Sequence, residues 1–197
     1  MPLEHNLGLV TLNSAFFSYG KAVLLDSTLP EDFCASVQQE KVTRAPLVPT
    51  MLQRLVEFEG LDKYDLSSLE ALYVGGAKTP SEVIKALWKK LGKIYINAFG
   101  MSEGVTCTTR LDDDEETVLN AAGRPCCPYD ELKVVDADGR DLPCNTEGEL
   151  IGKGPGVFFG YIRALEENKL SFTRDGFFIT GDLAVIDDSG IIRITGR

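Results

Sequence analysis

Residues 69–82 read LEALYVGGAKTPSE, and this stretch decides the fold. Residues 69–74 form an apolar, strand-like run that leads directly into the paired glycines Gly75 and Gly76. The next residues have the pattern of a helix start, in which Thr79 caps, Pro80 fits the first turn, and Glu82 returns a bond to the cap. The stretch therefore predicts a strand, a tight turn and a helix in direct succession.

The same alternation of strand and helix extends to both sides of this stretch. Gly92 closes the helix that begins near Pro80, and further apolar runs alternate with helical patterns. The predicted elements are strands at 23–25, 42–48, 69–74 and 94–98, and helices at 31–39, 50–58 and 80–91. Such alternation is typical of βαβ units and predicts a parallel sheet flanked by helices.

The pattern changes near Asn120. Beyond that residue the helical period fades, and short β runs are separated by glycine-containing hairpin signals at 138–139, 175–176 and 188–190. The run 152–156, Gly-Lys-Gly-Pro-Gly, is interpreted as a turn of the same region. We therefore expect an α/β fold with a parallel sheet and flanking helices in residues 1–119. A smaller antiparallel β lobe is expected in residues 120–197.

Composition excludes several classes of function. The 197 residues are 44 % hydrophobic, and 20 basic against 30 acidic residues give a formal net charge of −10. Nucleic acids and anionic membrane surfaces both attract Lys and Arg, so a chain this acidic is a poor ligand for either. No apolar run approaches the roughly 20 residues of a membrane span, and the N-terminus lacks a signal-peptide pattern. We expect a cytoplasmic protein that binds neither nucleic acid nor membranes.

The cysteines, the single histidine and the acidic run argue against a protein-built metal site. Five cysteines occur at 34, 107, 126, 127 and 144 without C-x-x-C spacing, so reduced thiols are expected. His5 alone cannot build a histidine-rich site. The acidic run 112–116 is interpreted as a solvated loop rather than a cation site.

Residues 100–104 spell G-x-S-x-G, the nucleophile elbow of hydrolases. An elbow must turn directly into a helix, whereas residues 105–109 (VTCTT) have strand propensity. The triad also needs a histidine after the serine, and the chain has none beyond Ser102. A hydrolase with Ser102 as nucleophile is therefore the least favoured hypothesis.

Two further motifs each have a structural and a functional interpretation. Gly75 and Gly76 either bring backbone amides close to an anionic ligand or form only a tight turn between strand and helix. They do not belong to a Walker phosphate loop, because the spacing of that motif is absent. Asp182 follows a Thr-Gly turn and is suited to accept hydrogen bonds from two vicinal hydroxyls, with Arg197 beside it. Alternatively, Asp182 and Arg197 form a surface ion pair.

The order of the motifs resembles that of the adenylate-forming enzymes, which include acyl- and aryl-CoA ligases, adenylation domains of peptide synthetases, and luciferase. The resemblance covers essentially the whole chain. It rests on 74–78 (VGGAK), 97–104 (NAFGMSEG), 148–150 with 160–161, 180–182 (TGD) and 196–197. Residues 2–6 (PLEHN) and 128–131 (PYDE) look closest to ligases that activate 2,3-dihydroxybenzoate or salicylate for siderophore synthesis.

The resemblance implies an activity and a set of residues. A carboxylic acid is joined to ATP, and its acyl group then passes to a pantetheine thiol of CoA or of an aryl carrier protein. Glu103 is implied to hold Mg²⁺, Ser102 to bond the α-phosphate, and Asp182 to bind the ribose. The other implied nucleotide-binding residues are Gly76, Ala77, Lys78, Asn97, Phe99, Gly100, Met101, Ile194 and Arg197. The implied acid-binding residues are Asn6, Gly75, Ala98 and Thr106. The implied catalytic residues are Ser102, Glu103 and His5, of which His5 lies beside the acid.

Asn6 is implied to hydrogen-bond the ortho-hydroxyl of the aryl acid, because an amide donates and accepts while remaining neutral. Phe99 and Ser102 stand where Tyr and Thr are commoner in these ligases, and Ala98 and Thr106 leave the identity of the acid open.

The upstream phosphate loop and the downstream domain with the catalytic lysine of these enzymes are not in the sequence. We therefore expect a fragment that depends on the remainder of its parent chain and is inactive alone. A general acyl-CoA synthetase fragment and a non-catalytic nucleotide-binding module are the alternatives.

Overall fold

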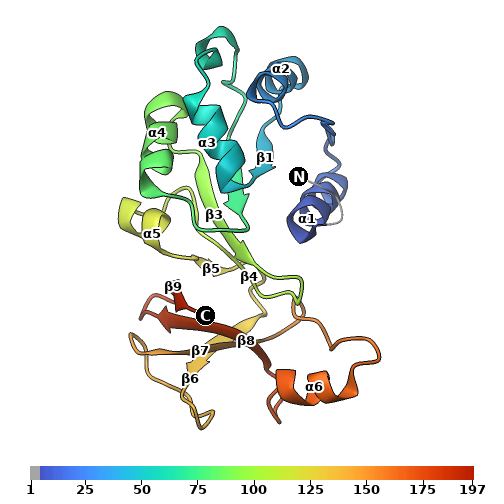
Figure 1. Ribbon diagram of the computed structural model, residues 1–197, viewed down its shortest axis with the longest axis vertical. Helices are drawn as coiled ribbons and strands as arrows, with labels where there is room; N and C mark the ends of the chain where they lie inside the picture. The colour runs from blue at the N-terminus through green and yellow to red at the C-terminus, as the bar shows by residue number, and fades with distance from the viewer. Residues whose placement is uncertain (1–4) are drawn as a thin grey trace. The chain divides into compact units, whose positions relative to one another are not determined.

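The computed structural model describes residues 5–197, so Pro2, Leu3 and Glu4 of the aryl-acid motif lie outside the described residues. The chain divides into two compact units, Met1–Ala98 and Phe99–Arg197 (Figure 1). The boundary that we expect between residues 119 and 120, where the helical pattern of the sequence fades, stays a prediction.

The first unit is built on parallel strands with helices in the connections. β1 (Arg44–Leu47) pairs in parallel with β2 (Ala71–Gly75), and β2 pairs in parallel with β3 (Tyr95–Gly100), whose last two residues belong to the second unit. The helices are α1 (Asn6–Phe17), α2 (Pro30–Glu40), α3 (Pro49–Glu57), the short η1 (Leu61–Lys63) and α4 (Ser81–Leu91). The predicted parallel α/β arrangement is confirmed.

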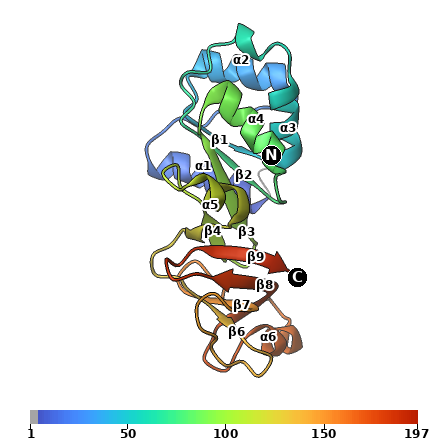
Figure 2. The ribbon, with the colours of Figure 1, turned by 90° about the vertical axis from the view of Figure 1, so that its left-hand side faces the viewer.

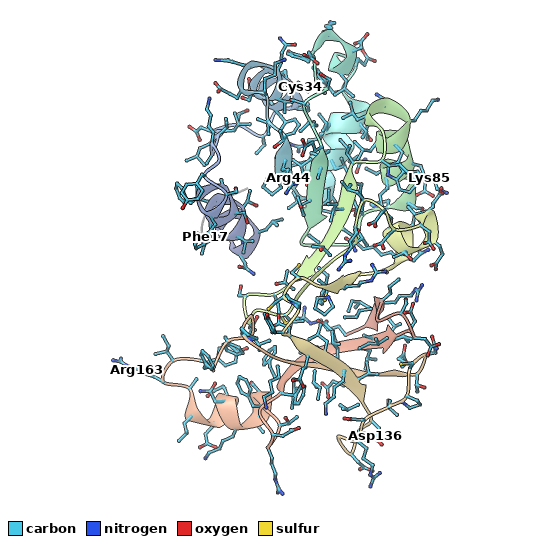
Figure 3. The ribbon with its side chains drawn as sticks, turned by 180° about the vertical axis from the view of Figure 1, so that it is seen from behind. Phe17, Cys34, Arg44, Lys85, Asp136 and Arg163 are labelled. Carbon is cyan, nitrogen blue, oxygen red and sulfur yellow. The ribbon has the colours of Figure 1, made fainter. Side chains whose placement is uncertain are left out.

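The helices of the first unit cover both sides of its strands. α3 and α4 lie side by side on one side, whereas α1 lies on the other side of β1 (Figures 1 and 2). Leu52 and Leu55 of α3 and Leu87 of α4 are buried, as expected for amphipathic helices. In α1 only Gly8 is buried, and Phe17 lies on its outer side (Figure 3).

Two local predictions for this unit are wrong. Residues 23–25 form no strand, and Leu24 is 66 % exposed, because strand propensity alone cannot hold a run that pairs with no neighbour. Thr79 does not cap α4, whose N-cap is Pro80, because the buried Thr79 hydroxyl faces the interior instead. Gly92 does end the helix, with φ at +84°.

The second unit is dominated by antiparallel strands. β4 (Thr106–Thr108) and β5 (Arg124–Pro125) form a short antiparallel pair. A separate sheet has the order β6 (Glu131–Val135), β7 (Glu147–Lys153), β8 (Phe178–Ile186) and β9 (Ile192–Gly196), with every pair antiparallel. The predicted antiparallel β lobe is confirmed, with turns at two of its three hairpin signals, 138–139 and 188–190, joining neighbouring strands.

Both faces of the four-stranded sheet are covered. Successive residues of a strand point to opposite faces, and the neighbours Val134 and Val135 are both buried, as are Leu150 and Ile151. On one face, residues of the sheet that include Ala184 and Ile192 pack against Cys107 and Ala122, and the other face packs against Phe177. The helix α6 (Leu165–Ser171), which the sequence analysis did not predict, lies beside the start of β8 (Figure 1).

The acidic run 112–116 is exposed as expected except at Asp113, but only its first three residues form a loop. Asp114 is the N-cap of α5 (Glu115–Asn120) and accepts a hydrogen bond from the backbone N–H of Thr117 at 2.7 Å. Asp113 pairs with Arg124 at 2.7 Å and is 7 % exposed. The run therefore starts a helix and supplies a partly buried ion pair.

All five cysteines are free, in agreement with the expected reduced thiols. Burial raises the pKa of Cys34 to about 11 and that of Cys107 to about 12. Within residues 5–197, no helix has the length and apolar character of a transmembrane segment.

Candidate functional site

The carboxyl ends of β2 and β3 bring several predicted site residues of the first unit together. Val74 lies opposite Asn97 and Gly75 lies opposite Ala98 in the parallel register. Open α/β sheets bind their ligands at the carboxyl ends of parallel strands. Gly75, Asn97 and Ala98 therefore share the edge at which a ligand is expected.

The turn after β2 depends on its glycines. A Cβ atom on Gly75 would lie 2.4 Å from the carbonyl oxygen of Ala98, so no side chain fits there. Gly76 has φ at +91°, a conformation that favours glycine. Gly76, Ala77 and Lys78 are exposed. The backbone of this turn is accessible to a flat or anionic ligand, and its role in binding one stays a prediction.

Hydrogen bonds among partly or fully buried side chains stabilise the carboxyl ends of β2 and β3. Tyr95 Oη donates to Thr79 Oγ1 at 3.0 Å. Asn97 Oδ1 lies 3.4 Å from Tyr95 Oη. Burial raises the pKa of Tyr95, which outweighs the opposing effect of the hydrogen bond to Thr79. The network links Asn97 on β3 to Thr79, just before α4, and so fixes the position of the turn after β2 relative to β3.

In the second unit, a tight turn presents Ser102 and Glu103. The Met101 N–H donates to the carbonyl of Val105 at 3.2 Å, and the Gly104 N–H donates to the carbonyl of Met101 at 3.0 Å. Ser102 is exposed at the tip. Strand β4, not a helix, follows this turn, so the G-x-S-x-G motif has no nucleophile-elbow geometry.

Glu103 is the carboxylate of this turn, and its Oε1 accepts a hydrogen bond from Tyr161 Oη at 2.8 Å. This hydrogen bond to a carboxylate raises the pKa of Tyr161. Residues 5–197 contain no group of three or more His, Cys, Asp or Glu side chains arranged to hold a metal ion. Mg²⁺ that accompanies substrate phosphates needs only one or two protein carboxylates, so Glu103 fits that requirement.

Asp182 sits in an irregular part of β8. Ile179 pairs with Ile151 and Leu183 pairs with Glu149, so the three residues between them face Leu150 alone. Gly181 takes φ at +74° within this bulge. Bulges re-aim side chains and are frequent beside functional sites.

The Thr180 hydroxyl compensates for the ladder bonds that the bulge disrupts. Its Oγ1 donates to the carbonyl of Leu150 at 2.7 Å and accepts from the N–H of Asp182 at 3.1 Å. Both Thr180 and Asp182 are buried. The Arg197 Nε lies 3.6 Å from Asp182 Oδ1, so the structure brings together the two residues that the sequence analysis paired.

The remaining predicted residues of the second unit lie on its apolar clusters. Phe99 packs against the cluster of Cys107 and Ala184 and also against the cluster of Val105 and Phe178. Three more candidates are half-buried: Met101, Thr106 and Ile194. Gly100 lies beside Thr106, since a Cβ atom there would be 3.3 Å from Thr106 Oγ1.

His5 and Asn6 lie at the start of α1. His5 is the N-cap residue, is exposed, and makes no side-chain capping bond. Asn6 is half-buried. The predicted roles of His5 and Asn6 in acid binding stay predictions.

Tyr161 and Thr180 are two residues to which the sequence analysis assigned no role. Both lie inside quoted motifs, 160–161 and 180–182, so the signal was present in the sequence. The hydrogen bond of Tyr161 to Glu103 and that of Thr180 to the Leu150 carbonyl join segments far apart in the chain, and local patterns do not reveal such contacts.

Comparison with known proteins identifies the family to which this chain belongs. The family described as AMP-binding enzyme matches residues 1–162. The 2,3-dihydroxybenzoate-AMP ligase of Bacillus subtilis (strain 168) is 38 % identical over all of this chain, which covers 37 % of that protein. Pyochelin synthase PchD of Pseudomonas aeruginosa is 37 % identical, again over all of this chain and 36 % of the relative.

A solved structure agrees with these relatives. The crystal structure of ATP-bound MatB from Rhodopseudomonas palustris has a TM-score of 0.90 to this chain at 32 % identity. It is matched over all of this chain and 39 % of the MatB chain. The chain thus spans less than two fifths of the length of these relatives.

Proposed function

The chain belongs to the family of AMP-binding enzymes, and from this membership we propose that it is part of a longer protein, the parent protein, that adenylates a hydroxybenzoate. The substrates are ATP, with Mg²⁺, and an aryl carboxylic acid. The acceptor of the acyl group is a pantetheine thiol of CoA or of an aryl carrier protein. The observation that carries the proposal is the identity of 38 % to a 2,3-dihydroxybenzoate-AMP ligase over the full length of this chain.

The first step is a displacement at phosphorus. A carboxylate oxygen of the acid forms a bond to the α-phosphorus of ATP, and the bond to pyrophosphate breaks with its electron pair on the leaving group. Such a step needs positioning and charge stabilisation rather than a protein nucleophile. In the second step the thiol loses its proton to solvent and its sulfur forms a bond to the acyl carbon, while the bond from that carbon to the phosphate oxygen breaks and AMP leaves with the electron pair.

The second unit supplies the residues that we propose for the phosphates and the ribose. The Asp182 carboxylate accepts hydrogen bonds from the ribose hydroxyls, because a charged acceptor gives stronger bonds than a neutral one. The exposed Ser102 hydroxyl donates to the α-phosphate. Glu103 would hold Mg²⁺, which neutralises phosphate charge when it is bound.

The first unit supplies the residues that we propose for the base and the acid. The accessible backbone of Gly76 and Ala77 forms one wall for the adenine, and the Asn97 amide reads its edge. Gly75 lets the backbone of β3 approach closely at Ala98, and Ala98 presents no group larger than a methyl to the aryl ring. Asn6 hydrogen-bonds the ortho-hydroxyl of the acid, and His5 lies beside that contact.

We place the parent protein in the cytoplasm, because five free cysteines suit a reducing compartment. Its macromolecular partner is a carrier protein with a pantetheine arm, unless CoA is the acceptor.

The test is ATP–pyrophosphate exchange by the parent protein across a panel of benzoates and fatty acids. We expect exchange that depends on salicylate or 2,3-dihydroxybenzoate. Exchange only with fatty acids would indicate a general acyl-CoA synthetase instead. Nucleotide binding without exchange for any acid would indicate a non-catalytic module.

A further inference from the structure

The hydrogen bond between Tyr161 and Glu103 has no part in the proposed chemistry described so far. It joins residues 58 positions apart in the chain, both within the second unit. The hydroxyl of Tyr161 engages Oε1 of Glu103, so Oε2 is the carboxylate oxygen that this bond does not use. A glutamate has several rotatable bonds, and holding it in one orientation costs conformational entropy unless a partner fixes it.

The two loops that carry these residues are closely packed. The Phe158 N–H donates to the carbonyl of Glu103 at 2.8 Å. A Cβ atom on Gly104 would lie 1.8 Å from the carbonyl oxygen of Gly156, so the backbones approach as closely as glycine allows. The backbone at Glu103 is therefore fixed against the segment that leads to Tyr161.

The Tyr161 ring is held by an aromatic cluster. Its centroid lies 4.8 Å from that of Phe158 in an edge-to-face arrangement. Phe158 also contacts Phe172 at 5.4 Å and Phe178 at 5.0 Å between centroids. This cluster orients the ring while the hydroxyl remains available to Glu103.

The backbone of Tyr161 is held by a side chain of α6. The Tyr161 N–H donates to Asn168 Oδ1 at 2.7 Å, and Asn168 Nδ2 donates to the Tyr161 carbonyl at 2.8 Å. Gly160 makes this approach possible, since its φ is +137° and a Cβ atom there would lie 2.9 Å from Asn168 Oδ1. The chain then extends outward at Arg163, ahead of α6 (Figure 3).

We propose that Tyr161 is a positioning residue that orients the Glu103 carboxylate for a divalent cation, and that Asn168 holds Tyr161 in place. The proposal rests on the proposed function, in which Glu103 is the protein ligand for Mg²⁺. Partners that hydrogen-bond a metal-ligating side chain fix its orientation, and their loss weakens metal binding. Tyr161 and Asn168 have that relation to Glu103, the first directly and the second through Tyr161.

The test measures Mn²⁺ binding, by electron paramagnetic resonance, to the parent protein saturated with a non-hydrolysable ATP analogue. The Tyr161→Phe variant keeps the ring in its cluster and removes only the hydroxyl. We expect its apparent dissociation constant for Mn²⁺ to rise about 3- to 10-fold, which corresponds to the typical net contribution of one hydrogen bond. Affinity for the analogue in EDTA stays unchanged. Tyr129→Phe removes another exposed hydroxyl of the second unit and leaves both values unchanged.

Two further variants locate the effect. In a Glu103→Gln background, Tyr161→Phe should cause no further loss of Mn²⁺ affinity, because the interaction with the carboxylate is already gone. Asn168→Ala should weaken Mn²⁺ binding about 2-fold while Tyr161 is intact, which keeps the proposal testable if Tyr161→Phe lowers the melting temperature.

Equal Mn²⁺ affinity for wild type and Tyr161→Phe would overturn the proposal, as would a loss that persists in the Glu103→Gln background. Failure of the proposed function appears separately. In that case the wild-type parent protein shows no acid-dependent pyrophosphate exchange, whatever its Mn²⁺ affinity.

Discussion

The Nε of Arg197 lies 3.6 Å from Oδ1 of Asp182, yet the carboxylate side chain is 9 % exposed and the arginine side chain is 83 % exposed. The fold holds the Asp182 carboxylate in place through the bulge of β8, whereas the Arg197 side chain is mostly exposed. An ion pair with one largely exposed partner contributes little to stability. The position of Asp182 is better explained as a built acceptor than as half of a surface ion pair.

We predict that Asp182→Ala in the parent protein weakens binding of ATP or AMP by about 1–3 kcal/mol, because two charge-assisted hydrogen bonds to the ribose are lost. Arg197→Ala should cost less than about 1 kcal/mol, in keeping with the exposure of its side chain. Isothermal titration calorimetry measures both. Unchanged affinity in Asp182→Ala would remove Asp182 from the nucleotide site.

The hydroxyl network behind β2 and β3 should contribute to stability. Tyr95→Phe leaves the buried Thr79 hydroxyl without its donor, so we expect the free energy of unfolding to fall by about 1 kcal/mol. Urea denaturation of the parent protein, followed through the transition of its large domain, provides the measurement. Tyr64→Phe, at a half-buried tyrosine of the same unit, is the matched control and should cost less.

The same residue predicts a dependence on alkaline pH. Burial raises the pKa of Tyr95 in the folded chain above that of an exposed tyrosine, about 10. The stability that the neutral phenol provides is therefore complete below pH 10 and is lost as the pH rises through the folded-state pKa. Melting temperatures of wild type should fall more steeply above pH 10 than those of Tyr95→Phe. Parallel curves for the two proteins would contradict the assignment.

Substrate choice should depend on Asn6. If its amide pairs with an ortho-hydroxyl, an acid that lacks this group loses the hydrogen bond, at a cost of about 1–3 kcal/mol or roughly 5- to 150-fold in kcat/KM. The parent protein should therefore prefer salicylate or 2,3-dihydroxybenzoate over benzoate. Asn6→Leu should remove the preference and leave benzoate largely unaffected. Equal kcat/KM for benzoate and salicylate on wild type would end the hydroxybenzoate hypothesis.

The parallel unit could be predicted because its signals are local. The run 69–74 and the glycines after it specify strand and turn, and β2 begins two residues after the start of that run and ends one residue beyond it, at Gly75. The antiparallel lobe was predictable for the same reason, since its hairpin turns carry glycine at fixed places.

The errors arise where distant contacts decide the outcome. Thr79 lies where a capping residue is expected from the sequence, but its hydroxyl instead accepts a hydrogen bond from Tyr95, 16 residues later. Helix α1 has apolar residues on every side rather than one stripe, so no helical period marked it.

The candidate site was predictable only in part. Its residue types and order were visible in the motifs, and the structure adds their neighbours: Gly75 beside Ala98, Tyr161 on Glu103, and Thr180 beneath Asp182. The bulge that aims Asp182 depends on the register of β7 against β8, and no local pattern in residues 179–183 encodes that register.

The central claim, formation of an acyl-adenylate, has one direct measurement. The parent protein is mixed with ATP, Mg²⁺ and salicylate without any thiol, then quenched and analysed by mass spectrometry. We predict an enzyme-bound mixed anhydride of salicylate and AMP, with one pyrophosphate released for each adenylate formed. Absence of that anhydride for salicylate and for 2,3-dihydroxybenzoate, or release of ADP and phosphate in place of pyrophosphate, would contradict the account.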